Sequence, residues 1–140
     1  MAYIVIADND DDVKDMFENK KAAAYLPYTG PRIDKDLKNE KFFIYRTKKN
    51  STPGVKTGII AYGTANGKEV PGNRCDSGKD AHNVNLDDFT VLETPMSFAE
   101  VKRIYDMHYD NKFVLVNVTV KRVKDDFAVE LIEDIKRRCL

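Results

Sequence analysis

Basic side chains that could bind an anion gather in the middle of the sequence. Between residues 46 and 79, two acids, Glu69 and Asp76, stand against seven bases: Arg46, Lys48, Lys49, Lys56, Lys68, Arg74 and Lys79. Such a local excess is typical of a solvated loop surface, and it is also what an edge facing an anionic ligand requires. The formal net charge of the chain is +0, which argues against a protein that coats DNA, because such proteins need a large basic excess.

The acidic run Asp8-Asn9-Asp10-Asp11-Asp12 has the spacing of the start of a calcium loop. An EF-hand loop that began at Asp8 would need Gly at its sixth position and Glu at its twelfth, where this chain has Val13 and Asn19. The acids fit better in the first turn of a helix, where the helix dipole favours negative charge. We therefore expect a helix start here and no metal site.

The histidines and cysteines give weak support for catalysis. His82 follows Cys75 and Ser77 in a polar stretch, but the spacing matches no nucleophile–histidine pattern, and a hydrolase built on His82 and Cys75 would need the two side chains within hydrogen-bond reach. His108 falls on the inner face of an expected helix, at the edge of a core. Zinc would need more Cys and His, and the glycines do not spell a P-loop. We predict that the chain is not an enzyme and needs no cofactor.

Apolar spacing indicates which elements position these residues. Strands are expected at residues 3–7, 42–47, 58–64, 89–92 and 113–123. The last is the clearest, because alternate residues from Val114 to Val120 are valines. Residues 68–85 are expected to form a long polar loop, and Asn66-Gly67 is a turn signal.

Three helices are expected between these strands. The first spans residues 9–25 and ends at Pro27. The second follows Ser97, which forms a capping-box pair with Glu100. The third begins at about Asp126. The order of elements favours an α+β fold, with a small mixed or antiparallel β-barrel and flanking helices.

The bulk properties favour one domain over residues 1–140. A chain of 140 residues with 42% hydrophobic residues can bury a core without disulfides. It has no apolar run long enough for a membrane span, and its N-terminal apolar run lacks the basic flank of a signal peptide. Two distant cysteines, Cys75 and Cys139, suit a reducing compartment, so we expect a cytoplasmic protein.

The N-terminal segment resembles the opening of response-regulator receiver domains, in which an apolar strand leads to an acidic cluster and a helix. A receiver also needs an Asp at the end of its third strand, and the corresponding strand here runs from Phe42 into Arg46 and Lys48. A non-enzymatic protein-interaction or regulatory domain with a receiver-like acidic N-terminus is therefore the alternative hypothesis. A five-stranded parallel sheet would favour it.

Residues 41–67 resemble the EVE domains of the PUA-like superfamily. The pattern of that family is an opening strand, a strand of the form V-x-x-Y-x-(S/T), a Pro-Gly turn and then G-I-x-x-x-G-x-V. Tyr45, Thr47, Pro53-Gly54 and the segment from Gly58 to Gly63 occupy the matching positions. The resemblance covers about half of the chain.

The resemblance implies a small β-barrel that binds a modified base in DNA or RNA. A flipped base needs an aromatic face and a few polar groups that read its edge. We expect the rings from Tyr45 and Tyr62, which could instead be core or cross-strand pairs of a barrel. The expected hydrogen-bonding groups are Asn9, Thr47 and Ser51. The residues expected to contact phosphates are Arg46, Lys48, Lys49 and Lys56; such contacts position the protein on the nucleic acid without selecting the base sequence.

Overall fold

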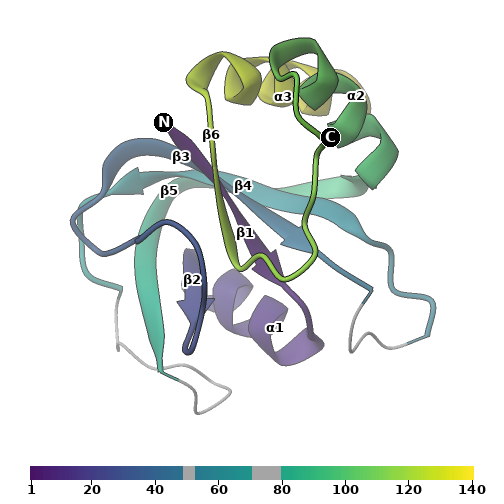
Figure 1. The fold of residues 1–140 in the computed structure, drawn as a ribbon. Coiled ribbons are helices and arrows are strands. Elements are labelled where there is room, and N and C mark those ends of the chain that lie inside the picture. The colour runs from purple at the N-terminus through teal and green to yellow at the C-terminus, as the bar shows by residue number, and fades with distance from the viewer. Residues whose placement is uncertain (49–52, 71–79) are drawn as a thin grey trace.

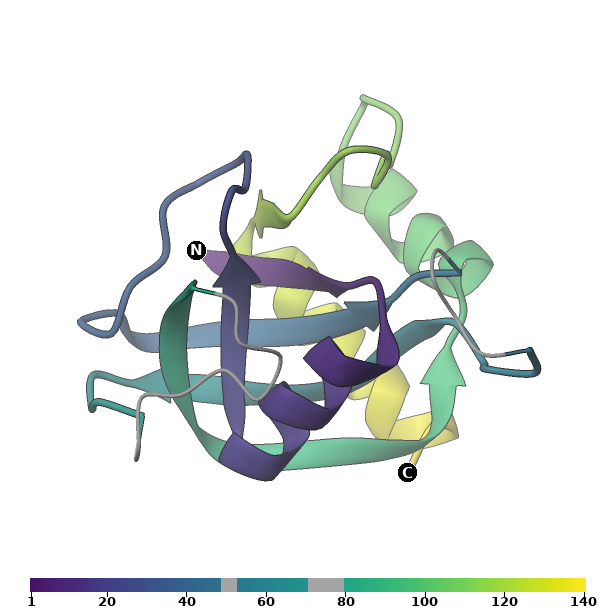
Figure 2. The ribbon, with the colours of Figure 1, turned by 90° about the horizontal axis from the view of Figure 1, so that it is seen from below.

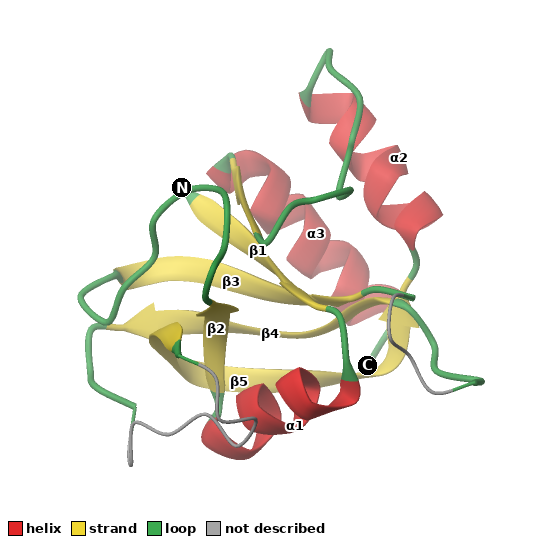
Figure 3. Cartoon of the chain, turned by 60° about the horizontal axis from the view of Figure 1, so that its bottom comes forward, coloured by secondary structure: helices red, strands yellow, loops and turns green. Residues whose placement is uncertain are grey.

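A computed structural model describes residues 1–48, 53–70 and 80–140, and in these ranges a curled sheet carries helices on both faces (Figures 1 and 3). The elements, in chain order, are β1 (Ala2–Ala7), α1 (Asp10–Asn19), β2 (Lys21–Tyr25), β3 (Lys38–Arg46), β4 (Gly58–Asn66), β5 (Ala81–Met96), α2 (Phe98–His108), β6 (Val120–Val123) and α3 (Asp125–Arg138). No helix in the described ranges has the length and apolar character needed to cross a membrane.

The six strands lie in the order β2-β5-β4-β3-β1-β6. Neighbouring strands are antiparallel except β1 and β3, which run parallel with Ile6 opposite Tyr45. The first part of β5 pairs with β2 and its later part pairs with β4, so the sheet bends round on itself (Figure 2). This mixed, curled sheet confirms the expected α+β class. It is not the five-stranded parallel sheet that would have favoured the receiver-like alternative.

Each face of the sheet has its own core. Alternate residues of β1 point to opposite faces, as in any strand. Ile4 joins Phe43 and Tyr45 beneath α2 and α3, whereas Tyr3 and Val5 face α1 and β2. In Figure 1, α2 and α3 accordingly lie on one side of the sheet and α1 on the other.

The prediction of a helix over residues 9–25 is wrong for the second half of that range. Helix α1 ends at Asn19, because Lys20 takes a left-handed conformation with φ 49° and its amide donates back to carbonyls of the last turn. The next five residues form β2, in which Ala22, Ala23 and Ala24 are fully buried. Pairing with β5 and burial of small side chains override the helix propensity of the alanines.

A buried ion pair joins α1 to β2. The Nζ atom of Lys21 lies 3.0 Å from Oδ2 of Asp15, and both side chains are fully buried. Asp15 also accepts hydrogen bonds from the hydroxyl of Tyr25 at 2.6 Å and from Nδ2 of Asn19 at 3.0 Å. This set of donors stabilises a carboxylate that would otherwise be costly to bury.

Two other expectations are corrected in the second half of the chain. The strand expected at 89–92 is part of the much longer β5, which begins at Ala81 within the expected polar loop. The strand expected at 113–123 is confined to β6, and residues 113–119 form a connecting segment. Val114 and Val116 are exposed there, so their alternation did not mark the buried face of a strand.

The helix signals near α2 were more accurate. The capping box is present: Ser97 accepts a hydrogen bond from the Glu100 amide, and the Glu100 carboxylate accepts one from the Ser97 amide. Helix α3 begins one residue before the expected position. His108 is half-buried at the edge of the core, as expected, and its Nε2 lies 3.0 Å from Glu130 on α3.

Candidate functional site

A groove with a volume of about 810 Å³ opens where β1 and β3 end, next to the first residue of α2. This volume lies in the range typical of small-molecule sites. The groove is lined by Ile6, Asp8, Tyr45, Thr47, Lys48, Thr57, Phe98 and residues 112–119. It therefore brings together four segments that are far apart in the sequence.

The parallel pairing of β1 and β3 explains why their polar ends share this groove. Ile6 lies opposite Tyr45, and the amide of Thr47 extends the pairing by donating to the carbonyl of Ala7 at 3.1 Å. Side chains two residues apart in an extended chain share a face. Asp8 and Thr47 thus follow Ile6 and Tyr45 on the face that α2 and α3 cover.

Aromatic rings form the inner part of the groove. Tyr45 is 4% exposed, and this burial raises the pKa of its hydroxyl to about 12. No residue within the described ranges is a hydrogen-bond partner of that hydroxyl. The Phe113 ring stacks on Phe98 with centroids 5.3 Å apart, and Phe98 remains 42% exposed. Phe98 therefore offers a ring face to a ligand, whereas Tyr45 is a nearly buried part of the lining.

The rim carries charges of both signs. Lys48 and Lys112 are exposed cations of the lining, one after β3 and the other after α2. Asp8 contributes a half-buried carboxylate, whose Oδ1 accepts a hydrogen bond from Nδ2 of Asn9 at 3.3 Å. Such a rim can hold anionic groups outside the groove and accept a hydrogen bond at one end of it.

The segment of residues 113–119 closes one side of the groove and is held at several points. Its Thr119 carbonyl accepts from the amide of Ile6 at 2.9 Å, and the amide of Val118 donates to Leu115 at 3.3 Å. The hydroxyl of Thr29 donates to the carbonyl of Asn117 at 3.2 Å. In Figure 1 this segment descends from the helices toward the end of β1 and turns back into β6.

Three residues expected from the sequence line the groove, namely Tyr45, Thr47 and Lys48. Lys49 and Ser51 lie outside the described residues. Lys56 is exposed but lines a different hollow, against α1.

Three other expected site residues are placed elsewhere by packing. Arg46 is 2% exposed and forms an ion pair with Asp10 at 2.7 Å, so it is not a rim cation. The side-chain oxygen of Asn9 caps α1 by accepting from the amide of Asp12 at 2.8 Å. Tyr62 lies in the core, where its ring packs on Phe43.

Sequence reasoning missed Asp8, Phe98, Lys112 and Phe113 as site residues. Asp8 was interpreted only as part of an acidic cluster. Phe98 directly follows Ser97, the cap of α2, and the sequence pattern predicted it only as part of that helix. The stacking of Phe98 on Phe113 depends on how α2 and the following segment return to the sheet, which local spacing does not reveal.

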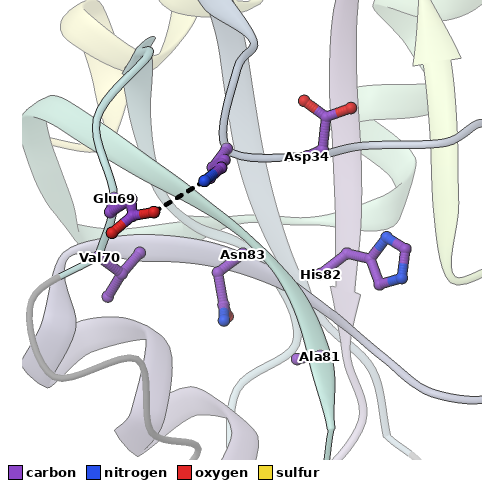
Figure 4. A pocket seen from close by; sticks show the side chains of 7 residues that line it. Asp34, Glu69, Val70, Ala81, His82 and Asn83 are labelled. Atoms are coloured by element: carbon purple, nitrogen blue, oxygen red, sulfur yellow. Dashed lines mark hydrogen bonds and ion pairs between the residues drawn. The ribbon is translucent and has the colours of Figure 1, made fainter.

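A smaller, more polar hollow of about 230 Å³ lies near the start of β5 (Figure 4). Lys35 and Glu69 form an ion pair at 2.7 Å at its edge, which raises the pKa of Lys35 and lowers that of Glu69. Nδ1 of His82 lies 3.2 Å from the carbonyl of Ile33, and in Figure 4 the imidazole points away from Glu69. Cys75, the expected partner of His82 in a hydrolase, lies outside the described residues. Within the described ranges no cluster of acids, histidines and cysteines could hold a metal ion.

Comparison with known proteins finds the fold but no sequence family. No protein-family model matches the chain, and no curated protein matches its sequence. The structure of human THYN1 protein in complex with 5-methylcytosine containing DNA is similar, with a TM-score of 0.56 and 10% identity over 96% of this chain and 97% of that one. The fold is PUA-like.

A second solved structure agrees with the first. Protein PSPTO5229 from Pseudomonas syringae matches with a TM-score of 0.55 and 12% identity, over 96% of this chain and 99% of its own. Both likenesses extend over nearly the whole of each chain. They confirm the fold class that the partial resemblance of residues 41–67 implied.

Proposed function

We propose that residues 1–140 form a single, non-enzymatic module that binds nucleic acid by taking one base, possibly a modified one, into the Tyr45 groove. The observation that carries the proposal is the groove itself: an exposed ring and a buried tyrosine lie inside a rim with two cations and one carboxylate. The DNA complex of the similarly folded THYN1 supports the same role.

Each group in the groove has a distinct part in this proposal. The exposed face of Phe98 stacks on the base, since every base has a π-face. The Tyr45 hydroxyl, whose pKa burial raises to about 12, is protonated at neutral pH like any tyrosine and can donate to a carbonyl oxygen of the base. Asp8 accepts from an exocyclic amino group, which favours cytosine or adenine over thymine. Lys48 and Lys112 contact the flanking phosphates.

Binding to a panel of short oligonucleotides tests the proposal. Single strands that differ at one central base, with cytosine in modified and unmodified forms, are titrated at low salt by fluorescence anisotropy. We expect Phe98→Ala to weaken binding about fivefold to hundredfold, the range found for loss of one stacking contact. If the protein binds no member of the panel, or if Phe98→Ala leaves the affinity unchanged, the groove is not a base site.

Two further variants separate the roles of the charges. Replacing Lys48 and Lys112 with Ala should weaken binding to all members of the panel and lower the salt dependence by about two phosphate contacts. Lys56→Ala is the matched control, because Lys56 is an exposed cation that does not line the groove. Asp8→Asn should instead reduce the preference for amino-bearing bases.

A further inference from the structure

The most exposed of the large apolar side chains in the described ranges lies on the lining of the groove. Val116 is 76% exposed, and its neighbour Val114 is 41% exposed. Both belong to the segment that closes one side of the groove. Exposed apolar groups next to a binding groove commonly mark a surface that is covered when a partner binds.

The tip that carries Val116 is fixed by its neighbours. Leu115 and Val118 close a turn around it, and Asn117 takes a left-handed conformation with φ 59°. The Asn117 carbonyl is in turn bound by Thr29. Valine is also stiff, because its branched Cβ leaves few side-chain rotamers. The apolar tip is therefore held in place before any partner arrives, which lowers the entropic cost of binding.

We infer that Val116 is a wedge that enters a DNA duplex at the position vacated by the base held in the groove. The inference rests on the proposed function and extends it from a single base to base-paired DNA. A base that leaves the stack opens a gap, and proteins that distort duplexes insert apolar side chains between base steps. Val116 belongs to the segment of residues 113–119 that closes one side of the groove. When a duplex places one base in the groove, the gap that this base leaves in the stack therefore lies next to Val116.

The flanking cations agree with this placement. Lys112 lies one residue before the segment, and Lys48 lies on the β3 side of the same groove. A flipped nucleotide keeps its backbone outside the pocket, with phosphates on both sides of the base. The two lysines can contact those phosphates while Val116 occupies the gap between them.

The experiment compares one sequence in single-stranded and duplex form. The target base is placed beside 2-aminopurine, whose fluorescence rises when its neighbour leaves the stack, and affinity is measured by anisotropy in the same samples. We expect Val116→Ser to weaken duplex binding roughly ten- to hundredfold, as loss of a buried valine-sized group predicts, and to abolish the fluorescence rise. Binding to the single strand should stay within about twofold, because burial of Val116 requires the duplex gap.

Val129→Ser is the matched control. Val129 is 56% exposed on α3 and does not line the groove, so both DNA forms should bind this variant as they bind the wild type. Because Val116 and Val129 are both exposed, neither substitution should alter the fold, which circular dichroism verifies.

The outcomes distinguish this inference from the proposed function. If single-strand binding depends on Phe98 while Val116→Ser has no effect on the duplex, the wedge is overturned and the base site stands. An equal loss of affinity for both DNA forms in Val116→Ser also overturns the wedge. If the wild type binds neither form, the proposed function itself fails.

Discussion

Replacing Lys21 with Met should greatly destabilise the protein. The substitution keeps most of the apolar stem and removes the ammonium group, which lies 3.0 Å from Asp15 in a place with no solvent exposure. The carboxylate of Asp15 then keeps the neutral donors Tyr25 and Asn19 but loses the positive charge beside it. Leaving one member of a buried ion pair without its partner costs about 3–5 kcal/mol. Since a domain of this kind has a total stability of about 5–15 kcal/mol, the loss should be easy to measure.

Urea unfolding at pH 7, followed by circular dichroism, is the assay. With a denaturant slope of about 1.5–2 kcal/mol/M, the transition midpoint of Lys21→Met should fall by about 2 M. Asp15→Asn should be destabilising as well, because it leaves the ammonium without its counter-charge. The double variant should be less destabilised than the sum of the single variants, since the two charges depend on each other. A Lys21→Met protein within about 1 kcal/mol of the wild type would refute this account of the pair.

Three smaller predictions concern stability. Gly58→Ala should lower the free energy of unfolding, measured by thermal unfolding, by about 2 kcal/mol or more, because Gly58 has φ 127° and an added Cβ would overlap a facing carbonyl. Gly54→Ala is the control and should cost less, since Gly54 has φ 87° and open space around it. The free energy of unfolding should fall between about pH 10 and pH 12, because burial raises the pKa of Tyr45 and the unfolded state therefore loses this proton at a lower pH than the folded state. Tyr45→Phe should remove this part of the pH dependence, which urea unfolding at several pH values measures. Ser97→Ala should cost about 1 kcal/mol through loss of the α2 cap, and an unchanged melting temperature would contradict that role.

The sequence was informative wherever a local pattern controls the structure. The strands that contain Ile6 and Tyr45, and the helix that starts after Ser97, follow from apolar spacing and capping chemistry. The pattern failed at residues 21–25, where a helix-like run of alanines is a strand. Two tertiary contacts decide that segment, namely pairing with the distant strand β5 and burial of the Lys21 charge against Asp15. Neither effect is visible in a window of a few residues.

Sequence reasoning likewise named some residues of the candidate site and missed others. Tyr45 and Thr47 were named because they occupy positions of the EVE pattern, and Lys48 because it belongs to the local run of basic residues. Arg46 was assigned to the rim as one of the same basic residues, although alternation along the strand turns it to the other face, where it pairs with Asp10. The aromatic and apolar side of the groove is formed by Phe98 and residues 113–119. These residues lie at the groove because α2 separates them in the sequence and the chain returns to the sheet after it.

The placement of β1 between β3 and β6 has a consequence for biosynthesis. Its two neighbours are residues 38–46 and 120–123, so β1 acquires its second neighbour only after residue 123 has been synthesised. Until then one edge of β1 has no strand beside it, and the segment of residues 113–119, which closes one side of the groove, is not held by β6. Contacts of such long sequence separation slow folding and prolong the life of partly folded chains. The nascent protein thus depends on residues 113–123 to complete the sheet and the groove.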